Sequence, residues 1–308
     1  FDWQNIYRGS LLILWGFFKK KVIADRALPL VSEVFGAHEP YGGAVIAIAV
    51  LFYSLQQYCD FSGGIDLVTG IAELFGIRLA PNFKRPYFSV SLGDFWRRWH
   101  ISLSSWFRDY LYIPLGGSRC SRFRKYCNLM ITFLVSGLWH GAAWNYVVWG
   151  GLHGVYQILE DLSKPVREKV TTKLHVDTKA FSHKFGQILI TFFLTTFAWI
   201  FFRAESLSQA GAYIVRMFTK WNPWVFFDEG LLKLGLDKME LNILVLALAA
   251  LLLTDILQYV KKLSLAEFLM KQGWWFRFAV LIVLILSVFV FGKYGVEFDS
   301  AQFIYFDF

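Results

Sequence analysis

The sequence predicts an all-α protein, a polytopic integral membrane helical bundle with re-entrant and interfacial helices. Of its 308 residues, 56% are hydrophobic and 19% are aromatic, whereas soluble domains are about 45–50% apolar. A soluble protein of this length could not bury so many large side chains, but a bilayer solvates them directly. Apolar runs near the length of a membrane span also recur along the chain, with basic residues clustered between them.

The basic excess is explained most simply by membrane topology. The net charge is +8, and Lys and Arg are retained on the cytoplasmic side of membrane proteins. We therefore expect membrane lipids as partners and no nucleic acid.

The cysteines and the N-terminal residues say less about the protein than its composition does. Cys59, Cys120 and Cys127 show no CxxC or Cys/His spacing, so we expect neither a metal site nor a disulfide framework. The chain begins at Phe1 without a signal-peptide pattern, and we interpret it as lacking its beginning. No repeat or linker divides it, which predicts a single domain over residues 1–308.

Several helices are predicted from apolar runs and their interruptions. Spans are expected at residues 185–202, 241–260 and 274–291. Two short helices, 42–57 and 66–76, are expected on either side of a polar stretch at 58–64. Residues 10–27 are interrupted by Lys19, Lys20 and Lys21, so they should lie in the interface or snorkel at one end. Residues 206–218 have an amphipathic pattern, and 221–224 form an aromatic turn suited to an interface.

Two further segments contain the candidate chemistry. Ser91 with Asp94 three residues later is typical of a helix N-terminus, and the predicted helix covers 91–112. Its apolar face follows i, i+3, i+4 spacing and comprises Trp96, Trp99, His100, Leu103, Phe107 and Tyr110. Residues 128–159 form a second apolar stretch, broken near Gly137 and Gly141.

The charge pattern gives a consistent topology. Residues 78–125 and 164–184 are basic and are expected on the cytoplasmic side, which makes the intervening stretch a hairpin. The three later spans then cross outward, inward and outward. This leaves an acidic C-terminal tail outside, containing Glu297, Asp299 and Asp307.

His140 is the strongest functional candidate among the residues. It lies in Ser136-Gly137-Leu138-Trp139-His140-Gly141, inside an apolar stretch where an ionisable group is costly. Imidazole suits a general base, but spacing alone supports a hydrogen-bonded core histidine equally well.

The other polar candidates have stronger structural interpretations. His100, with aromatic neighbours, is more simply a helix-packing histidine, and His153 is interpreted as structural. Arg97 and Arg98 fit either an anionic acyl donor or ordinary cytoplasmic anchors. The chain shows no G-x-S-x-G elbow, P-loop or zinc spacing, so a serine nucleophile is not indicated.

The motifs together resemble a known family. Segments 57–63 (QYCDFSG), 95–110 (FWRRWHISLSSWFRDY) and 138–141 (LWHG) are similar to the membrane-bound O-acyltransferase family. Segments 111–117 (LYIPLGG) and 303–308 (FIYFDF) resemble its bacterial branch, whose members acylate alginate or teichoic acid. The Leu-Gly-Gly run favours the alginate type, and the similarity extends over nearly the whole chain. It also implies that helices of the family preceding Phe1 are missing.

The resemblance implies a function and a set of site residues. It implies transfer of an acyl group, expected to be acetyl, from a cytoplasmic thioester toward hydroxyls of an extracytoplasmic polysaccharide, with an acetyltransferase partner. The donor would be acetyl-CoA or an acyl-carrier thioester, the location the bacterial inner membrane, and no cofactor is expected to stay bound. The implied catalytic residues are His140 and His100, and the substrate-binding residues are Trp96, Arg97, Arg98, Trp99, Trp139 and Asp60.

Three alternatives remain open at this point. One is D-alanyl or other acyl transfer to teichoic acid or another envelope polymer. Another is a carrier or flippase without bond chemistry, whose intramembrane histidine would serve gating or proton relay. The third is a scaffold that docks a transferase, although neither of these last two roles requires the long Trp-Arg-Arg-Trp-His motif.

Overall fold

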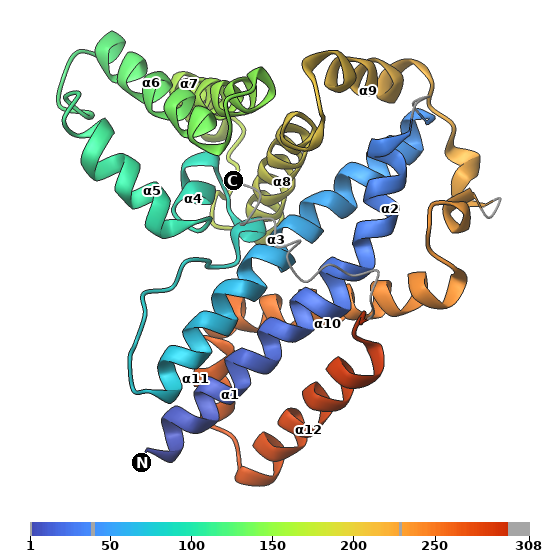
Figure 1. Ribbon diagram of the computed structural model, residues 1–308. Coiled ribbons are helices and arrows are strands. Elements are labelled where there is room, and N and C mark those ends of the chain that lie inside the picture. Colours follow the sequence, from blue (N-terminus) through green and yellow to red (C-terminus); the bar gives the residue numbers. More distant parts are fainter. Residues whose placement is uncertain (1, 38–40, 228–229, 295–308) are drawn as a thin grey trace. The chain divides into compact units, whose positions relative to one another are not determined.

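The computed structural model describes residues 2–37, 41–227 and 230–294, and within these residues it contains helices and no strand (Figure 1). Among the described residues, four helices are long and apolar enough to cross a membrane: α3 (Gly43–Leu74), α8 (Phe181–Arg203), α10 (Lys238–Lys261) and α12 (Trp274–Phe291). The predicted all-α membrane fold is thus confirmed. The acidic tail and the 303–308 motif lie outside the described residues, and the predicted topology stays a prediction.

The helices pack as two compact units. This division by contacts does not test whether the chain is one domain, so the single domain over residues 1–308 stays a prediction. The first unit contains α1 (Trp3–Phe17), η1 (Phe18–Ala24), α2 (Asp25–Gly36), α3, η4 (Pro223–Phe226), η5 (Gly230–Lys233), α10, α11 (Leu265–Met270) and α12. The second contains η2 (Pro86–Phe88), α4 (Leu92–Trp96), α5 (Ile101–Phe107), η3 (Arg108–Tyr112), α6 (Arg122–His140), α7 (Trp144–Lys173) and α8, and α9 (Leu207–Thr219) spans the boundary.

In the first unit, a long helical segment packs along α3 (Figure 1). It is formed by α1, η1 and α2 in succession, and η1 is a π-helical insertion between two α-helices. A Cβ at Gly9 would lie 2.7 Å from the Gly70 carbonyl oxygen, and one at Gly16 would lie 2.6 Å from that of Gly63. Paired glycines therefore let the two backbones approach closely, as small residues do in membrane helix pairs.

The predicted snorkelling is wrong for Lys19 and Lys20. Lys19 is 3% exposed and Lys20 is 9% exposed. Lys19 Nζ lies 2.8 Å from Asp66, and Lys20 Nζ lies 3.0 Å from Asp25 and also pairs with Asp60. The ammonium groups stay inside the unit because carboxylates from α2 and α3 compensate their desolvation.

The two short helices predicted around a polar gap are also wrong, because α3 runs through the gap as one helix of 32 residues. The polar side chains of the gap find partners inside the unit. Ser62 Oγ accepts a hydrogen bond from Lys19 Nζ at 2.7 Å, and the Tyr58 hydroxyl donates to Asp255 of α10 at 3.4 Å. These contacts hold the polar segment in a buried helix, where sequence alone suggests a break.

The predicted helix over residues 91–112 is divided in the second unit. Ser91 caps α4 as expected, since its Oγ accepts a hydrogen bond from the Asp94 amide at 3.0 Å. However, α4 ends at Trp96, and His100 adopts a left-handed conformation with φ of 44° before α5 begins. Trp96 and His100 therefore do not share one continuous helical face.

An asparagine from outside the segment explains the division. The amide of Ile101 donates to the Asn82 carbonyl oxygen at 3.0 Å, and the amide of Ser102 donates to Asn82 Oδ1 at 2.9 Å. Asn82 thus satisfies the first free N–H groups of α5 and makes a new helix start favourable there.

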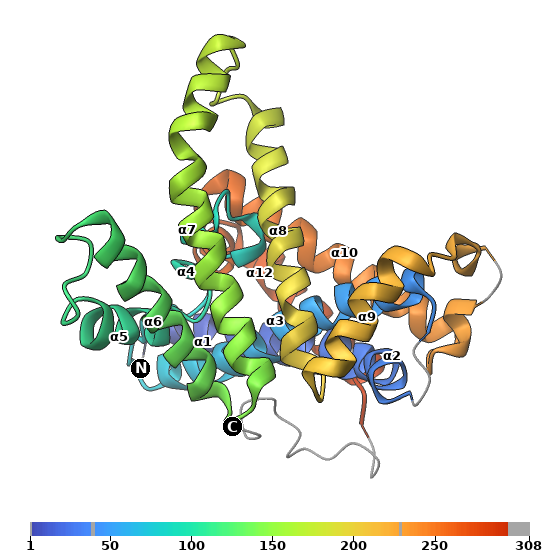
Figure 2. The same cartoon turned by 90° about the horizontal axis from the view of Figure 1, so that it is seen from above.

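The predicted break in residues 128–159 is confirmed near Gly141, where α6 ends, but Gly137 lies within α6. Gly137 serves close packing: a Cβ there would lie 2.3 Å from the Tyr146 carbonyl oxygen, and one at Gly150 would lie 2.2 Å from that of Phe133. The helices α6 and α7 thus form a tight hairpin, and α8 packs along α7 (Figure 2).

The remaining helix predictions are confirmed. The spans expected at 185–202, 241–260 and 274–291 correspond to α8, α10 and α12, and the amphipathic stretch at 206–218 corresponds to α9.

Replacing Gly150 with alanine should loosen the α6–α7 hairpin. The new methyl group would overlap the Phe133 carbonyl oxygen, so the helices must separate, at a cost of about 1–3 kcal/mol. Thermal unfolding in detergent should show a lower melting temperature. Gly186→Ala in α8 is the matched control, because a Cβ there meets open space. Equal melting temperatures for the two variants would contradict the tight crossing.

Replacing Asp60 with alanine should destabilise the first unit. The change removes one carboxylate from the buried Lys20 ammonium, and breaking a buried pair costs roughly 3 kcal/mol or more. The double variant Lys20→Met with Asp60→Leu should recover part of that loss. Glu168→Gln breaks the exposed pair with Lys164 at 4.0 Å and should change stability by less than about 1 kcal/mol. A similar small loss for Asp60→Ala would refute the role of the buried pair.

Candidate functional site

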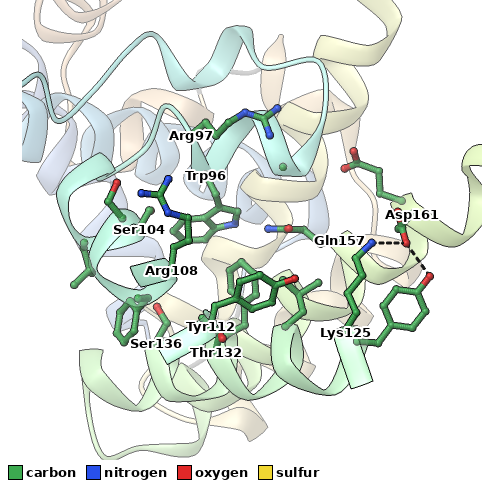
Figure 3. A pocket seen from close by; sticks show the side chains of 18 of the residues that line it. Trp96, Arg97, Ser104, Arg108, Tyr112, Lys125, Thr132, Ser136, Gln157 and Asp161 are labelled. Atoms are coloured by element: carbon green, nitrogen blue, oxygen red, sulfur yellow. Dashed lines mark hydrogen bonds and ion pairs between the residues drawn. The ribbon is translucent and has the colours of Figure 1, made fainter. Parts of the chain in front are cut away.

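A cavity of about 760 Å³ lies in the second unit, between α4, α5, η3, α6 and α7 (Figure 3). Aromatic and aliphatic side chains form part of its wall: Trp96, Ile101, Leu103, Phe107, Leu129 and Phe133. Polar groups also line it, among them Ser104, Thr132, Ser136 and Gln157. A largely apolar pocket of this size with a few polar groups fits a small-molecule ligand.

The charged side chains around the cavity are mainly basic. Five are positive and two are negative: Arg97, Arg108, Lys125, Lys164 and Arg167, against Glu160 and Asp161. This excess favours a ligand that combines an apolar part with a negative charge.

Two of the arginines are available to an incoming anion. The Arg97 side chain is 71% exposed and lies 3.8 Å from Asp94, and the Arg108 side chain is 61% exposed and pairs with Asp109 at 2.8 Å. Exposed ion pairs of this kind contribute little free energy, so both guanidinium groups can exchange their partner for a phosphate oxygen.

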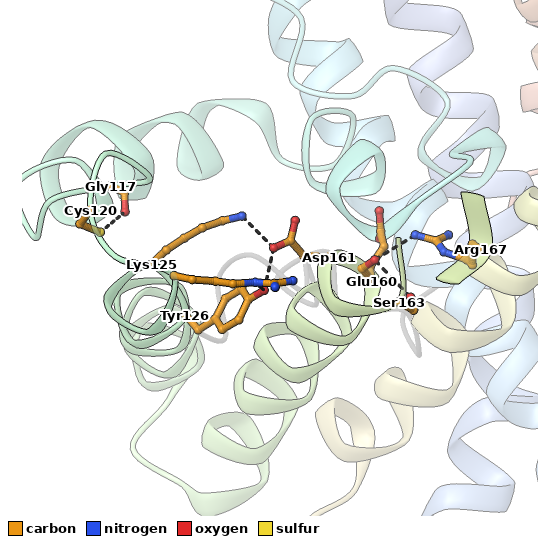
Figure 4. Close-up of polar contacts among 9 residues, drawn as sticks. Gly117, Cys120, Lys125, Tyr126, Glu160, Asp161, Ser163 and Arg167 are labelled. Carbon is orange, nitrogen blue, oxygen red and sulfur yellow. Dashed lines mark hydrogen bonds and ion pairs between the residues drawn. The ribbon is translucent and has the colours of Figure 1, made fainter. Parts of the chain in front are cut away.

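An ion pair joins α6 to α7 beside the cavity (Figures 3 and 4). Lys125 Nζ lies 2.9 Å from Asp161 Oδ2, and the Tyr126 hydroxyl donates to the same oxygen at 2.8 Å. Two hydrogen bonds lower the pKa of Asp161, the larger effect coming from Lys125 and the smaller from Tyr126. Asp161 therefore stays ionised and fixes the Lys125 ammonium at the cavity wall.

Glu160 fixes α4 against α7. Its carboxylate accepts a hydrogen bond from the Leu92 amide at 2.7 Å, close to the start of α4. Its carbonyl oxygen accepts one from Arg167 at 2.9 Å (Figure 4). A carboxylate near the first turn of a helix is electrostatically favourable, and this contact holds the segment that includes Trp96.

His140 is the last residue of α6 and lies within an aromatic cluster. Its ring centroid lies 5.0 Å from that of Trp139, 5.2 Å from that of Trp149 and 5.3 Å from that of Phe202. The residue is half-buried. Ser136, one helical turn earlier, lines the cavity, whereas His140 and His100 are not among its lining residues.

His100 lies at the start of α5 and is 6% exposed. Its Nδ1 is 3.4 Å from Asn82 Oδ1 and 3.5 Å from Ser102 Oγ. Burial, and to a smaller extent the nearby His140, lowers the pKa of His100 to about 3. His100 is therefore neutral at physiological pH and can act through hydrogen bonds rather than charge.

A third histidine, His153, also lies in this region. From the sequence it is interpreted only as a structural residue. It is 1% exposed, and its Nδ1 accepts a hydrogen bond from Trp96 Nε1 at 3.3 Å. Its ring contacts Trp149 at 5.1 Å between centroids, so Trp149 contacts both His153 and His140.

The other residues implied by the resemblance occupy different environments. Arg98 pairs with Asp94 at 3.0 Å. Trp99 is 4% exposed and stacks with Phe95, whereas Trp139 is 47% exposed. Asp60 belongs to the first unit, buried beside Lys20.

Of the predicted binding residues, Trp96 and Arg97 line the cavity. The binding roles of all six residues, and the catalytic roles of His140 and His100, stay predictions. Within residues 2–37, 41–227 and 230–294, no group of three or more His, Cys, Asp or Glu is arranged to hold a metal ion.

Sequence reasoning missed several cavity residues, notably Lys125, Gln157 and Asp161. They lie on α6 and α7 and meet at the cavity only because the hairpin folds back. The basic character of residues 78–125 is visible in the sequence, but apart from Arg97 and Arg98 it is explained there by membrane topology.

Comparison with known proteins supports the motif resemblance. Residues 39–202, a little over half of the chain, match the membrane-bound O-acyltransferase family. A probable alginate O-acetylase of Azotobacter vinelandii is 37% identical, over 82% of this chain and 47% of the relative. A peptidoglycan O-acetyltransferase of Helicobacter pylori is 39% identical, over 68% of this chain and 38% of the relative.

A teichoic acid D-alanyltransferase of Streptococcus thermophilus is 29% identical, over 48% of this chain and 39% of the relative. The chain thus spans about half the length, or less, of these curated relatives. The predicted family is confirmed: this chain belongs to the membrane-bound O-acyltransferase family.

Proposed function

We propose that this protein transfers an acetyl group from a cytoplasmic thioester toward hydroxyls of an extracytoplasmic polysaccharide such as alginate, in the bacterial inner membrane. The observation that supports this best is the amphipathic, positively charged cavity whose wall includes Ser136, one turn from His140. Acetyl transfer is favoured over D-alanyl transfer, because relatives named as O-acetylases match a larger share of the chain. An extracytoplasmic acetyltransferase would act as partner.

The cavity suits the donor in its chemistry. Acetyl-CoA and acyl-carrier thioesters both carry an acyl group on a phosphopantetheine arm, with negative phosphate at the far end. Arg97, Arg108 and Lys125 would bind the phosphate, and the apolar wall around Trp96 and Phe107 would accommodate the arm and the acetyl end.

His140 would act as the general base in the transfer. Its ring nitrogen takes the proton from the acceptor hydroxyl while the hydroxyl oxygen attacks the thioester carbonyl carbon. The new C–O bond forms, the C–S bond breaks, and the leaving thiolate takes up the proton that His140 accepted, which restores the neutral base. His100, which is neutral, would orient the thioester by hydrogen bonding rather than by charge.

Replacing His140 with alanine should abolish ester formation in cells carrying the full-length protein. General-base catalysis contributes roughly 10²–10⁴-fold, so acetyl esters on the surface polysaccharide should fall below detection at matched membrane abundance. His175→Asn is the control, because His175 is exposed outside the cavity. Unchanged ester content in the His140 variant would favour a transport or scaffold role instead.

Replacing Arg97 and Arg108 together with glutamine should weaken donor binding. Removing two phosphate contacts should raise the KM for acetyl-CoA about tenfold while kcat stays within about twofold, because both contacts persist unchanged through the reaction. Steady-state kinetics on the full-length protein in nanodiscs measure both constants. Arg124→Gln, an exposed change away from the cavity, should leave KM unaltered. An unchanged KM in the double variant would exclude these arginines from the donor site.

A further inference from the structure

We propose that His153 is a positioning residue of the donor cavity, which holds the Trp96 indole in place as part of the cavity wall. The geometry that carries this is the 3.3 Å hydrogen bond from Trp96 Nε1 to His153 Nδ1, made where the His153 ring also contacts Phe95, Phe133 and Trp149. The effect on donor binding rests on the proposed function, whereas the hydrogen bond itself does not.

The hydrogen bond defines the state of the imidazole. Because Trp96 Nε1 can only donate, His153 Nδ1 must present a lone pair. The ring proton of the neutral imidazole therefore lies on Nε2. Among the residues that the structure describes, Nε2 is buried without a hydrogen-bond partner.

An unpartnered buried N–H group has a free-energy cost that an apolar side chain would avoid. A purely packing role among Phe95, Phe133 and Trp149 would be filled more favourably by leucine or phenylalanine. The benefit that offsets this cost is the acceptor at Nδ1, since its bond with Trp96 is the one hydrogen bond that the His153 side chain makes within the described part of the chain.

Trp96 is the residue on which this contact acts. Its indole lines the cavity, and it packs against Phe133 at 5.4 Å and Trp149 at 5.9 Å between ring centroids. Trp149 in turn contacts His140. The orientation of Trp96 therefore shapes the part of the cavity wall that packs against Trp149, the ring that contacts His140.

With its only polar atom bonded to His153, Trp96 presents hydrocarbon to the ligand. If that bond were absent, Nε1 would lack its acceptor and the indole would be free to reorient toward polar groups in the cavity. The donor arm would then lose an apolar surface, and its acyl end would be less well placed.

The first test compares two replacements of similar size. His153→Asn keeps an oxygen acceptor near the position of Nδ1, and His153→Leu removes it. We expect His153→Leu to raise the KM for acetyl-CoA about three- to tenfold, the range of one net hydrogen bond, and His153→Asn to restore a value near wild type. Melting temperatures of the two variants separate this effect from unfolding. Equal KM values for Leu and Asn, at equal stability, would overturn the proposal.

A double-mutant cycle tests whether His153 acts through Trp96. Trp96→Phe removes the indole N–H, so adding His153→Leu in that background should not raise KM further. Additive effects of the two changes would show that His153 acts by another route, and the proposal would fall.

A spectroscopic readout keeps the inference separate from the proposed activity. With ¹⁵N-labelled tryptophan, the Trp96 indole signal is identified by its loss in Trp96→Phe. In wild type and His153→Asn this N–H should resonate downfield and exchange slowly, and in His153→Leu it should move upfield and exchange faster. An unchanged signal in His153→Leu would refute the bond. If the bond is observed but wild-type protein shows no acyl transfer, the proposed function fails instead.

Discussion

The close approach of α6 and α7 is the constraint on which the second unit depends. Two glycines, Gly137 and Gly150, allow each helix to contact the backbone of the other. This approach brings Trp149 of α7 against His140 of α6. It also places Lys125 opposite Asp161 at the other end of the hairpin. One pair of small residues therefore determines both the aromatic surroundings of the candidate base and the charged side of the cavity.

The first unit is constrained instead by charged side chains buried inside it. Lys19 and Lys20 lie deep in the unit, and carboxylates on α2 and α3 surround them. The compensation makes these helices mutually dependent, because each would expose an uncompensated charge without the others. Asp60 belongs to the Gln-Tyr-Cys-Asp-Phe motif, and its ion pair shows that this motif contributes to the internal structure of the unit.

The sequence predicts an element of this structure well when the residues that stabilise it lie close together along the chain, and poorly when they lie far apart. The spans α8, α10 and α12 were predictable, because hydrophobic length alone defines them. The continuity of α3 was not, because the lysines that pair with its acidic residues lie about forty positions away. The division at His100 was equally hidden, because it depends on Asn82 and not on local propensity. The motif resemblance indicated His140 and His100, but the cavity beside them emerges only when α6 and α7 fold together.

The π-helical segment η1 (Phe18–Ala24) has a consequence for how this chain tolerates insertions and deletions. A π turn holds one more residue than an α turn in about the same rotation, so η1 accommodates an extra residue without turning α1 away from α3. Deleting one residue within η1 would let the segment wind as an α-helix, with Gly9 and Gly16 of α1 still facing α3. Inserting one residue in the last α-helical turn of α1 would instead rotate the preceding turns, including Gly9, by roughly 100° about the helix axis. A change of one residue in length is therefore tolerated in η1 and disruptive in the α-helical turns beside it.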